Sequence, residues 1–369
     1  MTRPALASLT SIVIKAGSAL VQAGPEVLSA IAADIAHLRQ AGVNVVLVSS
    51  GAVALGRERL GLTQPVLSLE QKQAAAAAGQ PRLAAAWEAA FEPHGLATAQ
   101  ALLTLDVTEN RRSWLNARAT LQTLAELGAI AIVNENDTIA TDEIRYGDND
   151  RLAARVAQLI GADLLVLLSD IDGLYEQDPR LHPDARFIAD IPRIDERIHA
   201  MAGTANAAAA VGTGGMRTKI LAAELAGRSG CATAIALGLA PEPILSLEDF
   251  AHGSWFHPAR SSARAREAWI SGSVSPDAAV RIDAGAVSAL RAGKSLLPVG
   301  LTGIEGRFER GDTIRILDSD GRTIGRGVTA YASGDAARIA GARTEDIESL
   351  LGYRRSSALI HVDDLVLDD

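Results

Sequence analysis

The stretch SIVIKAGS, residues 11–18, sets the pattern for most of the chain. A short apolar run ends in a lysine, a glycine and a serine, which is typical of a strand that is buried on both faces and carries polar residues at its carboxyl end. Further runs of strand length follow at VNVVLV (43–48), LATAQALL (96–103), AIAIVN (129–134), DLLVLLS (163–169) and CATAIAL (231–237).

Alanine- and leucine-rich segments with helical spacing separate several of these runs. They cover residues 25–41, 69–92, 111–127, 150–161 and 216–229. Strands that alternate with helices predict an α/β fold, with a mainly parallel sheet and helices on both of its faces in an αβα sandwich.

A different pattern begins after about residue 260. The polar, basic stretch 257–276 is typical of a connector. Beyond it, short β-type runs such as TIRILDSDG (313–321) and TIGRGV (323–328) alternate with turn signals, which favours a small β-rich barrel. We therefore predict two domains, at residues 8–260 and 276–366.

Composition argues against several classes of function. The net charge of −9 disfavours a general binder of nucleic acid or of membrane surfaces. The single cysteine, Cys231, rules out an internal disulfide, and its place at the start of an apolar run indicates a buried thiol. The first residues lack the apolar core of a signal peptide and the other apolar runs are short, so we expect a cytoplasmic protein without membrane association.

Lysine is scarce in this chain. Of 35 basic residues only four are lysine, namely Lys15, Lys72, Lys219 and Lys294. A lysine that persists where arginine otherwise serves is a candidate for a role that needs a compact point charge. Lys15 and Lys219 stand in glycine-containing sequence and are the stronger candidates, whereas Lys72 is interpreted as a solvated residue.

Four polar motifs fall where predicted strands end. They are Lys15-Ala16-Gly17-Ser18, Ser49-Ser50-Gly51-Ala52, Asn134-Glu135-Asn136-Asp137 and Ser169-Asp170. In an open parallel sheet, ligands bind outside the carboxyl ends of the strands. An ordinary strand-to-helix turn would explain any one of these motifs, but four at one edge favour a shared site.

A fifth motif, GTGGMRTK at residues 212–219, stands just before a predicted helix. It lacks the spacing of a P-loop, but its glycines allow backbone N–H groups to approach phosphate oxygens at a helix N-terminus. A plain glycine-rich loop is the alternative. With Lys15 at a neighbouring strand end, phosphate binding is the better interpretation. Lys15 and Lys219 would stabilise a transferring phosphoryl group, and Asp150 would hold both charges in place.

The stretch NENDTIATDEIRYGDND, residues 134–150, contains six acids, three asparagines and one basic residue, Arg145. We expect some of the acids to organise cations and others to bind substrate. Asparagine amides can meet a carboxylate without repulsion, Asp137 could accept an ammonium group, and Ser50 with the backbone of Gly51 could hold a further carboxylate. This mixture fits a small zwitterionic acid with an extra carboxylate.

The motifs resemble those of the amino acid kinase family. The matching stretches run from about residue 11 to 219 and are IVIKAGSAL, VSSGAVALGRERLG, KQAAAAAGQPRL, LNARATL, VNENDTIATDEIRYGDND, LLSDIDGLYEQDPR and GTGGMRTK. The C-terminal stretches VRIDAGAVSALRAGKSLLPVG, GRFERGD and GYRRSSALIHVDDLVL resemble a PUA domain. The resemblance assigns residues 8–260 to a kinase domain and 276–366 to a PUA-like domain.

The resemblance implies ATP-dependent phosphorylation of the γ-carboxylate of L-glutamate by direct in-line transfer, which gives glutamyl 5-phosphate in the first step of proline biosynthesis. Catalytic roles fall on Lys15, Lys219 and Asp150. Glutamate would contact Ser50, Gly51, Asn134, Asp137 and Asn149. The nucleotide would contact Lys15, Gly17, Ser18, Ser169, Asp170, Tyr175, Thr213, Gly214, Gly215, Met216, Arg217, Thr218 and Lys219. Mg²⁺ would be held mainly by the ATP phosphates, so no metal ligand is assigned to the protein.

Further partners follow from the same resemblance. Proline would act as a feedback inhibitor, the chain would form a dimer or tetramer, and a glutamyl phosphate reductase could receive the product. N-acetylglutamate, aspartate, carbamate or a nucleoside monophosphate are alternative substrates within the family. An RNA-binding protein that works through its PUA-like domain is the alternative from another class. Acidic residues outnumber basic ones in 277–369, however, which is a poor electrostatic footprint for RNA.

Overall fold

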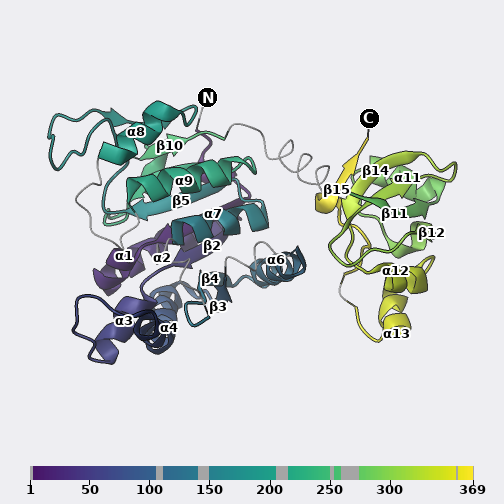
Figure 1. The fold of residues 1–369 in the computed structure, drawn as a ribbon, viewed down its shortest axis with the longest axis horizontal. Helices are drawn as coiled ribbons and strands as arrows, with labels where there is room; N and C mark the ends of the chain where they lie inside the picture. Colours follow the sequence, from purple (N-terminus) through teal and green to yellow (C-terminus); the bar gives the residue numbers. More distant parts are fainter. Residues whose placement is uncertain are drawn as a thin grey trace. The chain divides into compact units, whose positions relative to one another are not determined.

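The structure, a computed structural model, describes residues 3–104, 111–139, 149–204, 215–249, 253–258, 274–354 and 356–368. Contacts between residues divide the chain into two units, Met1–Ser262 and Ala263–Asp369 (Figure 1). Most of the expected connector and residues 140–148 of the acidic stretch lie outside the described residues.

The first unit is built on an eight-stranded sheet with the order β3-β4-β2-β1-β5-β9-β10-β8. The pairs from β3 to β9 are parallel, β10 pairs antiparallel with β9, and β8 pairs parallel with β10. The strands are β1 (Ser11–Ala16), β2 (Asn44–Ser49), β3 (Thr98–Leu103), β4 (Ile130–Glu135), β5 (Leu164–Ser169), β8 (Asp190–Ile191), β9 (Ala232–Leu237) and β10 (Ser254–Phe256). A separate hairpin pairs β6 (Leu174–Tyr175) with β7 (Phe187–Ile188).

Helices connect most of these strands. They are α1 (Ser18–Gln22), α2 (Pro25–Gln40), α3 (Ala52–Arg59), α4 (Leu69–Phe91), α6 (Arg111–Glu126), α7 (Asn149–Ile160), α8 (Glu196–Thr204) and α9 (Met216–Gly227), with short 3-10 helices at Leu6–Ser8, Glu92–His94 and Leu245–Glu248. The expected α/β class is confirmed, and the predicted strands and helices of this unit coincide with observed elements to within two residues at each end. The sequence did not indicate α1, α3, α8 or the short strands β6, β7, β8 and β10.

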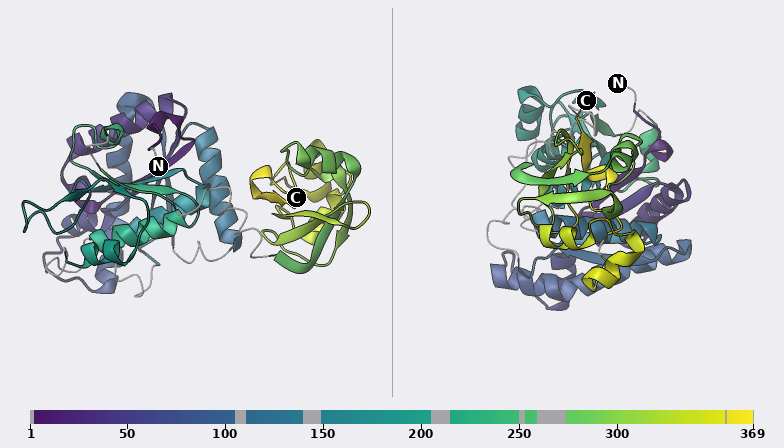
Figure 2. Two further views of the ribbon diagram at one scale, coloured as in Figure 1. Left: turned by 90° about the horizontal axis from the view of Figure 1, so that it is seen from above. Right: turned by 90° about the vertical axis from the view of Figure 1, so that its right-hand side faces the viewer.

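Alternate residues of each strand pack on opposite faces of the sheet. Ile12 and Ile14 of β1 join α2 and α4 in one core, whereas Val13 joins α7 and α9 in the other. Figure 2 shows helices on both sides of these strands. Burial on both faces explains why the strands are continuous apolar runs in the sequence. Among the described helices, none is both long and apolar enough to cross a membrane.

A change of direction in the strand order marks the place of a ligand site. β1 is followed in the chain by β2 on one side of it, while β5 lies on its other side and is followed further out by β9. Open α/β sheets bind ligands outside the carboxyl ends of their strands at such a point. Ala16, Ser49 and Ser169 end β1, β2 and β5, so the polar motifs gather at this edge as predicted.

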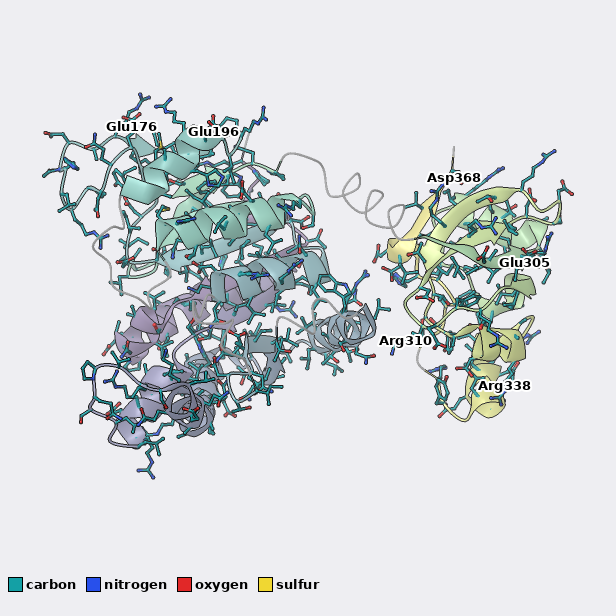
Figure 3. All side chains as sticks on the ribbon, in the orientation of Figure 1. Glu176, Glu196, Glu305, Arg310, Arg338 and Asp368 are labelled. Atoms are coloured by element: carbon teal, nitrogen blue, oxygen red, sulfur yellow. The ribbon has the colours of Figure 1, made fainter. Side chains whose placement is uncertain are left out.

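The second unit has a five-stranded sheet with the order β12-β11-β13-β14-β15. Its strands are β11 (Val274–Ile282), β12 (Leu301–Glu305), β13 (Thr313–Leu317), β14 (Thr323–Val328) and β15 (Leu365–Leu367). Its helices are α11 (Ala284–Arg291), α12 (Ser333–Ile339) and α13 (Ile347–Leu351), with 3-10 helices at Pro298–Gly300, Thr344–Asp346 and Val362–Asp364. The expected β-rich character is confirmed, although its helices were not predicted. Acidic and basic side chains project from this unit, among them Glu305, Arg310, Arg338 and Asp368 (Figure 3).

Candidate active site

Lys15 reaches the site because of its position along β1. It shares a strand face with Val13, which packs in the same core as α7 and α9. Those two helices lie side by side over the sheet (Figure 1). Asp150 and Lys219 stand in their first turns. One strand end and two helix starts therefore bring three charged side chains together.

These three side chains form a buried ionic cluster. Lys15 Nζ lies 2.7 Å from Asp150 Oδ1, and Lys219 Nζ lies 3.3 Å from Asp150 Oδ2. The exposed fraction is 7% for Lys15, 4% for Lys219 and 0% for Asp150. Buried charges are unfavourable unless they are paired and hydrogen-bonded, as they are here. Among the side chains that the structure describes here, two ammonium groups meet one carboxylate, which suits an anionic ligand.

Asp150 is held in its ionised form. Burial by itself raises the pKa of a carboxyl group, but attraction to the ammonium groups of Lys15 and Lys219 opposes it. Together with hydrogen bonds from Lys15 and Thr218, this attraction holds the pKa of Asp150 well below its usual range. At neutral pH the carboxylate therefore fixes the two ammonium groups without taking a proton from either.

The start of α9 adds a neutral group to the cluster. Thr218 Oγ1 lies 3.0 Å from Asp150 Oδ2 and 2.7 Å from the carbonyl oxygen of Gly215. Met216 is buried, whereas Arg217 is exposed on the same turn. The predicted residues Thr213 and Gly214 lie outside the described residues. Phosphate binding by this loop stays a prediction.

A second, uncharged group of side chains lies where β2 and β4 end and α7 begins. Asn149 Nδ2 donates to Ser50 Oγ at 2.6 Å and to Asn134 Oδ1 at 3.0 Å. Gly51 precedes α3 with a φ of +115°, and a Cβ there would lie 3.2 Å from the side chain of Val21. Glycine is therefore the residue that fits this turn. Four of the five residues expected to bind glutamate are brought together in this way.

Two side chains of α4 that the sequence analysis did not single out complete this group. Gln80 Oε1 accepts a hydrogen bond from Asn134 Nδ2 at 2.8 Å, and Trp87 Nε1 donates to Ser49 Oγ at 2.8 Å. Both side chains are buried. They stand two helical turns apart and so face the same side of α4. A signal was available, because Gln80 is a polar residue on the helix face that carries Leu83 into the core.

The two carboxyl groups near the end of β4 differ from Asp150. Burial raises the pKa of Asp137 to about 6. Burial and repulsion from Asp137 raise the pKa of Glu135 to about 7, against an opposing effect of Arg151. Asp137, the fifth residue expected to bind glutamate, is half-buried. A carboxyl group whose pKa is raised in this way is stabilised in its ionised form when a cation is added beside it.

Four residues expected to hold the nucleotide lie at the ends of β1 and β5. A Cβ at Gly17 would lie 3.6 Å from Lys15 Nζ, so this backbone passes close to the ionic cluster. Ser18 begins α1 directly after it. Ser169 ends β5, with its Oγ 3.2 Å from Oδ1 of the exposed Asp170.

Tyr175 has other neighbours. Its hydroxyl lies 3.0 Å from Asp172 Oδ1, and its ring packs edge-on against Phe187 at 5.3 Å between centroids. Burial and the nearby Asp172 raise the pKa of Tyr175 to about 12. These contacts place Tyr175 in the β6–β7 hairpin, and its expected contact with the nucleotide stays a prediction.

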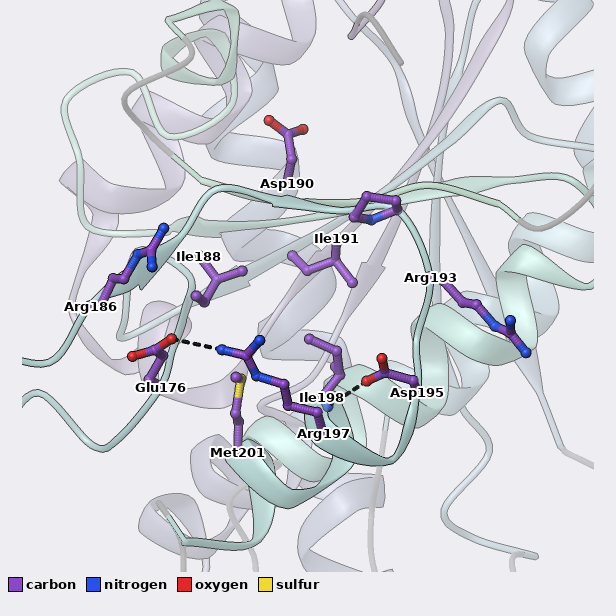
Figure 4. Close-up of a pocket in the computed structure, with 11 residues that line it drawn as sticks. Glu176, Arg186, Ile188, Asp190, Ile191, Arg193, Asp195, Arg197, Ile198 and Met201 are labelled. Carbon is purple, nitrogen blue, oxygen red and sulfur yellow. Dashed lines mark hydrogen bonds and ion pairs between the residues drawn. The ribbon is translucent and has the colours of Figure 1, made fainter.

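A cavity of about 260 Å³ lies against the same hairpin and α8. Side chains of both charges line it, including Glu176, Arg186, Arg193 and Arg197, and Glu176 accepts a hydrogen bond from Arg197 at 2.9 Å (Figure 4). None of the residues predicted for the site lines this cavity. It is therefore separate from the cluster at Asp150.

The sequence comparisons with protein families and with curated relatives agree with each other. Residues 10–236 match the model of the amino acid kinase family, and residues 278–351 match that of the PUA domain. Glutamate 5-kinase of Caulobacter vibrioides is 56% identical over 362 residues, covering 96% of each chain. Glutamate 5-kinase of Paramagnetospirillum magneticum is 50% identical over 369 residues, covering 98% of this chain and 99% of that one. A solved carbamate kinase from Giardia lamblia bound to AMP-PNP is 16% identical, with a TM-score of 0.48 over 68% of this chain and 99% of that one.

Proposed function

The chain belongs to the amino acid kinase family, and from this membership we propose that it is an ATP-dependent kinase that phosphorylates the γ-carboxylate of L-glutamate to glutamyl 5-phosphate, the first step of proline biosynthesis. The observation that carries the proposal is the buried pair of ammonium groups on the single carboxylate of Asp150. Phosphoryl transfer needs fixed positive charge beside the migrating group more than it needs covalent chemistry.

Lys15 and Lys219 have the geometry for that role. Each touches a different oxygen of Asp150, so the two ammonium groups lie on either side of one anchor. They would contact the oxygens of the γ-phosphate and stabilise the charge that spreads over them during transfer. Asp150 positions the two lysines and takes no part as a base. The acceptor carboxylate is already ionised at neutral pH, so the reaction needs no group to remove a proton.

The uncharged group would hold the acceptor. The hydroxyl of Ser50 and the backbone N–H at Gly51 can donate to a carboxylate, and the uncharged amides of Asn134 and Asn149 line the same space without repelling it. Asp137 would pair with the α-ammonium group. This pairing favours L-glutamate over N-acetylglutamate, in which the nitrogen carries no charge.

The nucleotide would extend from the ionic cluster over Gly17, Ser18, Ser169 and Asp170. Within the described ranges, no group of three or more His, Cys, Asp and Glu side chains is placed to hold a metal ion. The two ammonium groups at Asp150 would repel a bare cation. We expect Mg²⁺ to be held mainly by the ATP phosphates, where it would neutralise part of their charge.

The remaining partners rest on family membership. We propose feedback inhibition by proline at the glutamate site, self-association into a dimer or tetramer, and a regulatory role for the PUA domain. In that domain, Arg281 pairs with Glu305 at 2.6 Å and Arg326 with Asp368 at 2.5 Å. Arginines that are neutralised in this way do not favour RNA binding.

A hydroxamate assay tests the proposed reaction, because hydroxylamine traps an acyl phosphate directly. We expect hydroxamate to form only when L-glutamate and ATP are both present. Aspartate, N-acetylglutamate, carbamate and a nucleoside monophosphate, each followed by ADP release, serve as comparison substrates. Strong turnover of one of these with none of glutamate would replace the proposed substrate.

A further inference from the structure

Gln80 is held in place by contact between two helix backbones. A Cβ at Gly79 would lie 1.8 Å from the carbonyl oxygen of Ala52, and a Cβ at Gly56 would lie 1.7 Å from that of Ala75. Helices α3 and α4 can approach this closely only because both positions are glycine. Gln80 is 8% exposed and directly follows the Gly79 contact. Its position relative to the turn at Gly51 is therefore fixed by the backbone.

A chain of side-chain amides runs from Gln80 to the start of α7. Gln80 Oε1 accepts from Asn134 Nδ2, and Asn134 Oδ1 accepts from Asn149 Nδ2. Asn149 Nδ2 uses its second hydrogen for Ser50 Oγ. Asn149 Oδ1 and Gln80 Nε2 are buried and have no hydrogen-bond partner within the described part of the chain. Both are polar atoms of side chains that are more than nine-tenths buried.

The two ends of such a chain are coupled. Every link must pair a donor with an acceptor, so the direction of one amide fixes the direction of the next. An acceptor offered by Gln80 at the α4 end obliges Asn134 to offer its own oxygen to Asn149. Asn149 then donates both N–H groups of Nδ2 within the chain, and its Oδ1 has no partner among the described residues. A buried acceptor without a partner is unfavourable, and a donor on the ligand can remove that cost.

We propose that Gln80 is a positioning residue for the acceptor substrate. By offering Oε1 to Asn134 it sets the direction of the amide chain, so that Asn149 presents an oxygen to an N–H of the substrate's ammonium group. An ammonium group has three N–H donors. Asp137 is expected to accept one or two of them, so at least one remains for Asn149 Oδ1. The acceptor site thereby selects a dicarboxylic acid that carries an ammonium group. This inference rests on the proposed kinase function.

The test compares L-glutamate with glutarate, a dicarboxylate of the same length without the ammonium group. In Gln80→Met the side chain keeps its approximate size but loses its acceptor, so the direction of the chain is no longer fixed. We expect the preference for glutamate over glutarate, as a ratio of kcat/KM values, to fall about 10-fold. This fall should come from a higher KM for glutamate, with kcat and the KM for ATP within about 3-fold of the parent.

Two further variants separate positioning from general damage. Gln80→Glu retains an oxygen acceptor for Asn134 and should keep the preference within about 3-fold of the parent. Gln122→Met, on the exposed face of α6, is the matched control and should change neither KM. Gln80→Ala provides the same deletion if the methionine variant does not fold, and thermal unfolding is measured for all.

An unchanged glutamate-to-glutarate preference in both deletion variants overturns the proposal. An equal loss for the two substrates, or a loss in Gln80→Glu as large as in Gln80→Met, also overturns it, because Gln80 would then act through packing. Turnover of glutamate by the parent enzyme is judged separately. Its absence would refute the proposed function, whereas turnover with an unaltered preference would refute only the role of Gln80.

Discussion

The two halves of the candidate site differ in the charge of their side chains. Around Asp150, two buried ammonium groups lie 2.7 and 3.3 Å from one buried carboxylate. Around Asn149, four neutral side chains are linked at 2.6–3.0 Å. Fixed charge is suited to a group whose own charge redistributes during reaction. Neutral amides are suited to a ligand that carries both signs, because each amide can turn either a donor or an acceptor toward it.

The two halves also depend on different parts of the fold. The charged half draws on one strand end and two helix starts from the same face of the sheet. The neutral half depends on α4 from the opposite face, through Gln80 and Trp87. Substitutions in the first half should therefore reduce turnover, and substitutions in the second should change substrate affinity or stability.

The largest effect is expected from replacing the two site lysines. Lys15→Arg and Lys219→Arg keep the positive charge but replace a compact ammonium with a broad guanidinium in a buried space. We expect each to lower kcat by about 100-fold or more, the effect of losing one oriented charge in a transition state. Steady-state kinetics with glutamate and ATP provide the measurement, with thermal unfolding as a check on folding.

Lys72→Arg and Lys294→Arg serve as the matched controls for these variants. Both lysines are exposed, and their replacement should leave kcat within about 2-fold. Similar, small effects at all four lysines would contradict the role given to Lys15 and Lys219. They would also contradict the inference that a scarce lysine marks a functional position.

The close contact between α3 and α4 is the next point to break. Gly79→Ala places a methyl group 1.8 Å from the Ala52 carbonyl oxygen, so one helix must move. We expect the free energy of unfolding to fall by about 2–3 kcal/mol in spite of the better helix propensity of alanine. Denaturant unfolding measures this. Gly227→Ala on α9, whose nearest neighbour would lie 3.8 Å away, is the control and should be near neutral.

Sequence alone predicted the charged half more fully than the neutral half. Lys15, Asp150 and Lys219 stand at strand and helix ends, and the parallel topology brings such ends to one edge. Gln80 and Trp87 lie inside a long helix. Helical spacing places Gln80 on the same face as Leu83, but it does not show which atoms the amide meets until the helix is docked. The rotation of α4 depends on the Gly56 and Gly79 contacts, which no periodicity reveals. Thr213, Gly214 and most of the acidic loop lie outside the described residues, so their roles stay predictions.

Asp137 offers a pH-dependent test of the proposed glutamate site. Burial raises its pKa to about 6, so the free enzyme carries a protonated Asp137 in more acidic solution. Only the ionised form can pair with an ammonium group, and the KM for glutamate should therefore rise as the pH falls below about 6. Asp137→Asn should raise this KM by about 10- to 30-fold at pH 8, the effect of about 1.4–2 kcal/mol, and leave the KM for ATP largely unchanged. A glutamate KM that stays the same in the variant would remove Asp137 from the substrate site.

Glu135 differs from Asp150 in how it should affect folding stability as the pH changes. Its pKa is raised to about 7, so the folded protein favours the neutral form, whereas the unfolded chain ionises near the ordinary value of 4.5. The unfolded state therefore loses its proton first as the pH rises, and folding stability falls between these two values and is constant above them.

Glu135→Gln removes this dependence of folding stability on pH. Relative to the parent, it should gain about 2 kcal/mol of stability between pH 4.5 and pH 8, the order of magnitude that a raised pKa of about 7 implies. Urea unfolding of both proteins across this range measures the difference. A difference that does not change with pH would mean that the pKa of Glu135 is not raised in the folded protein.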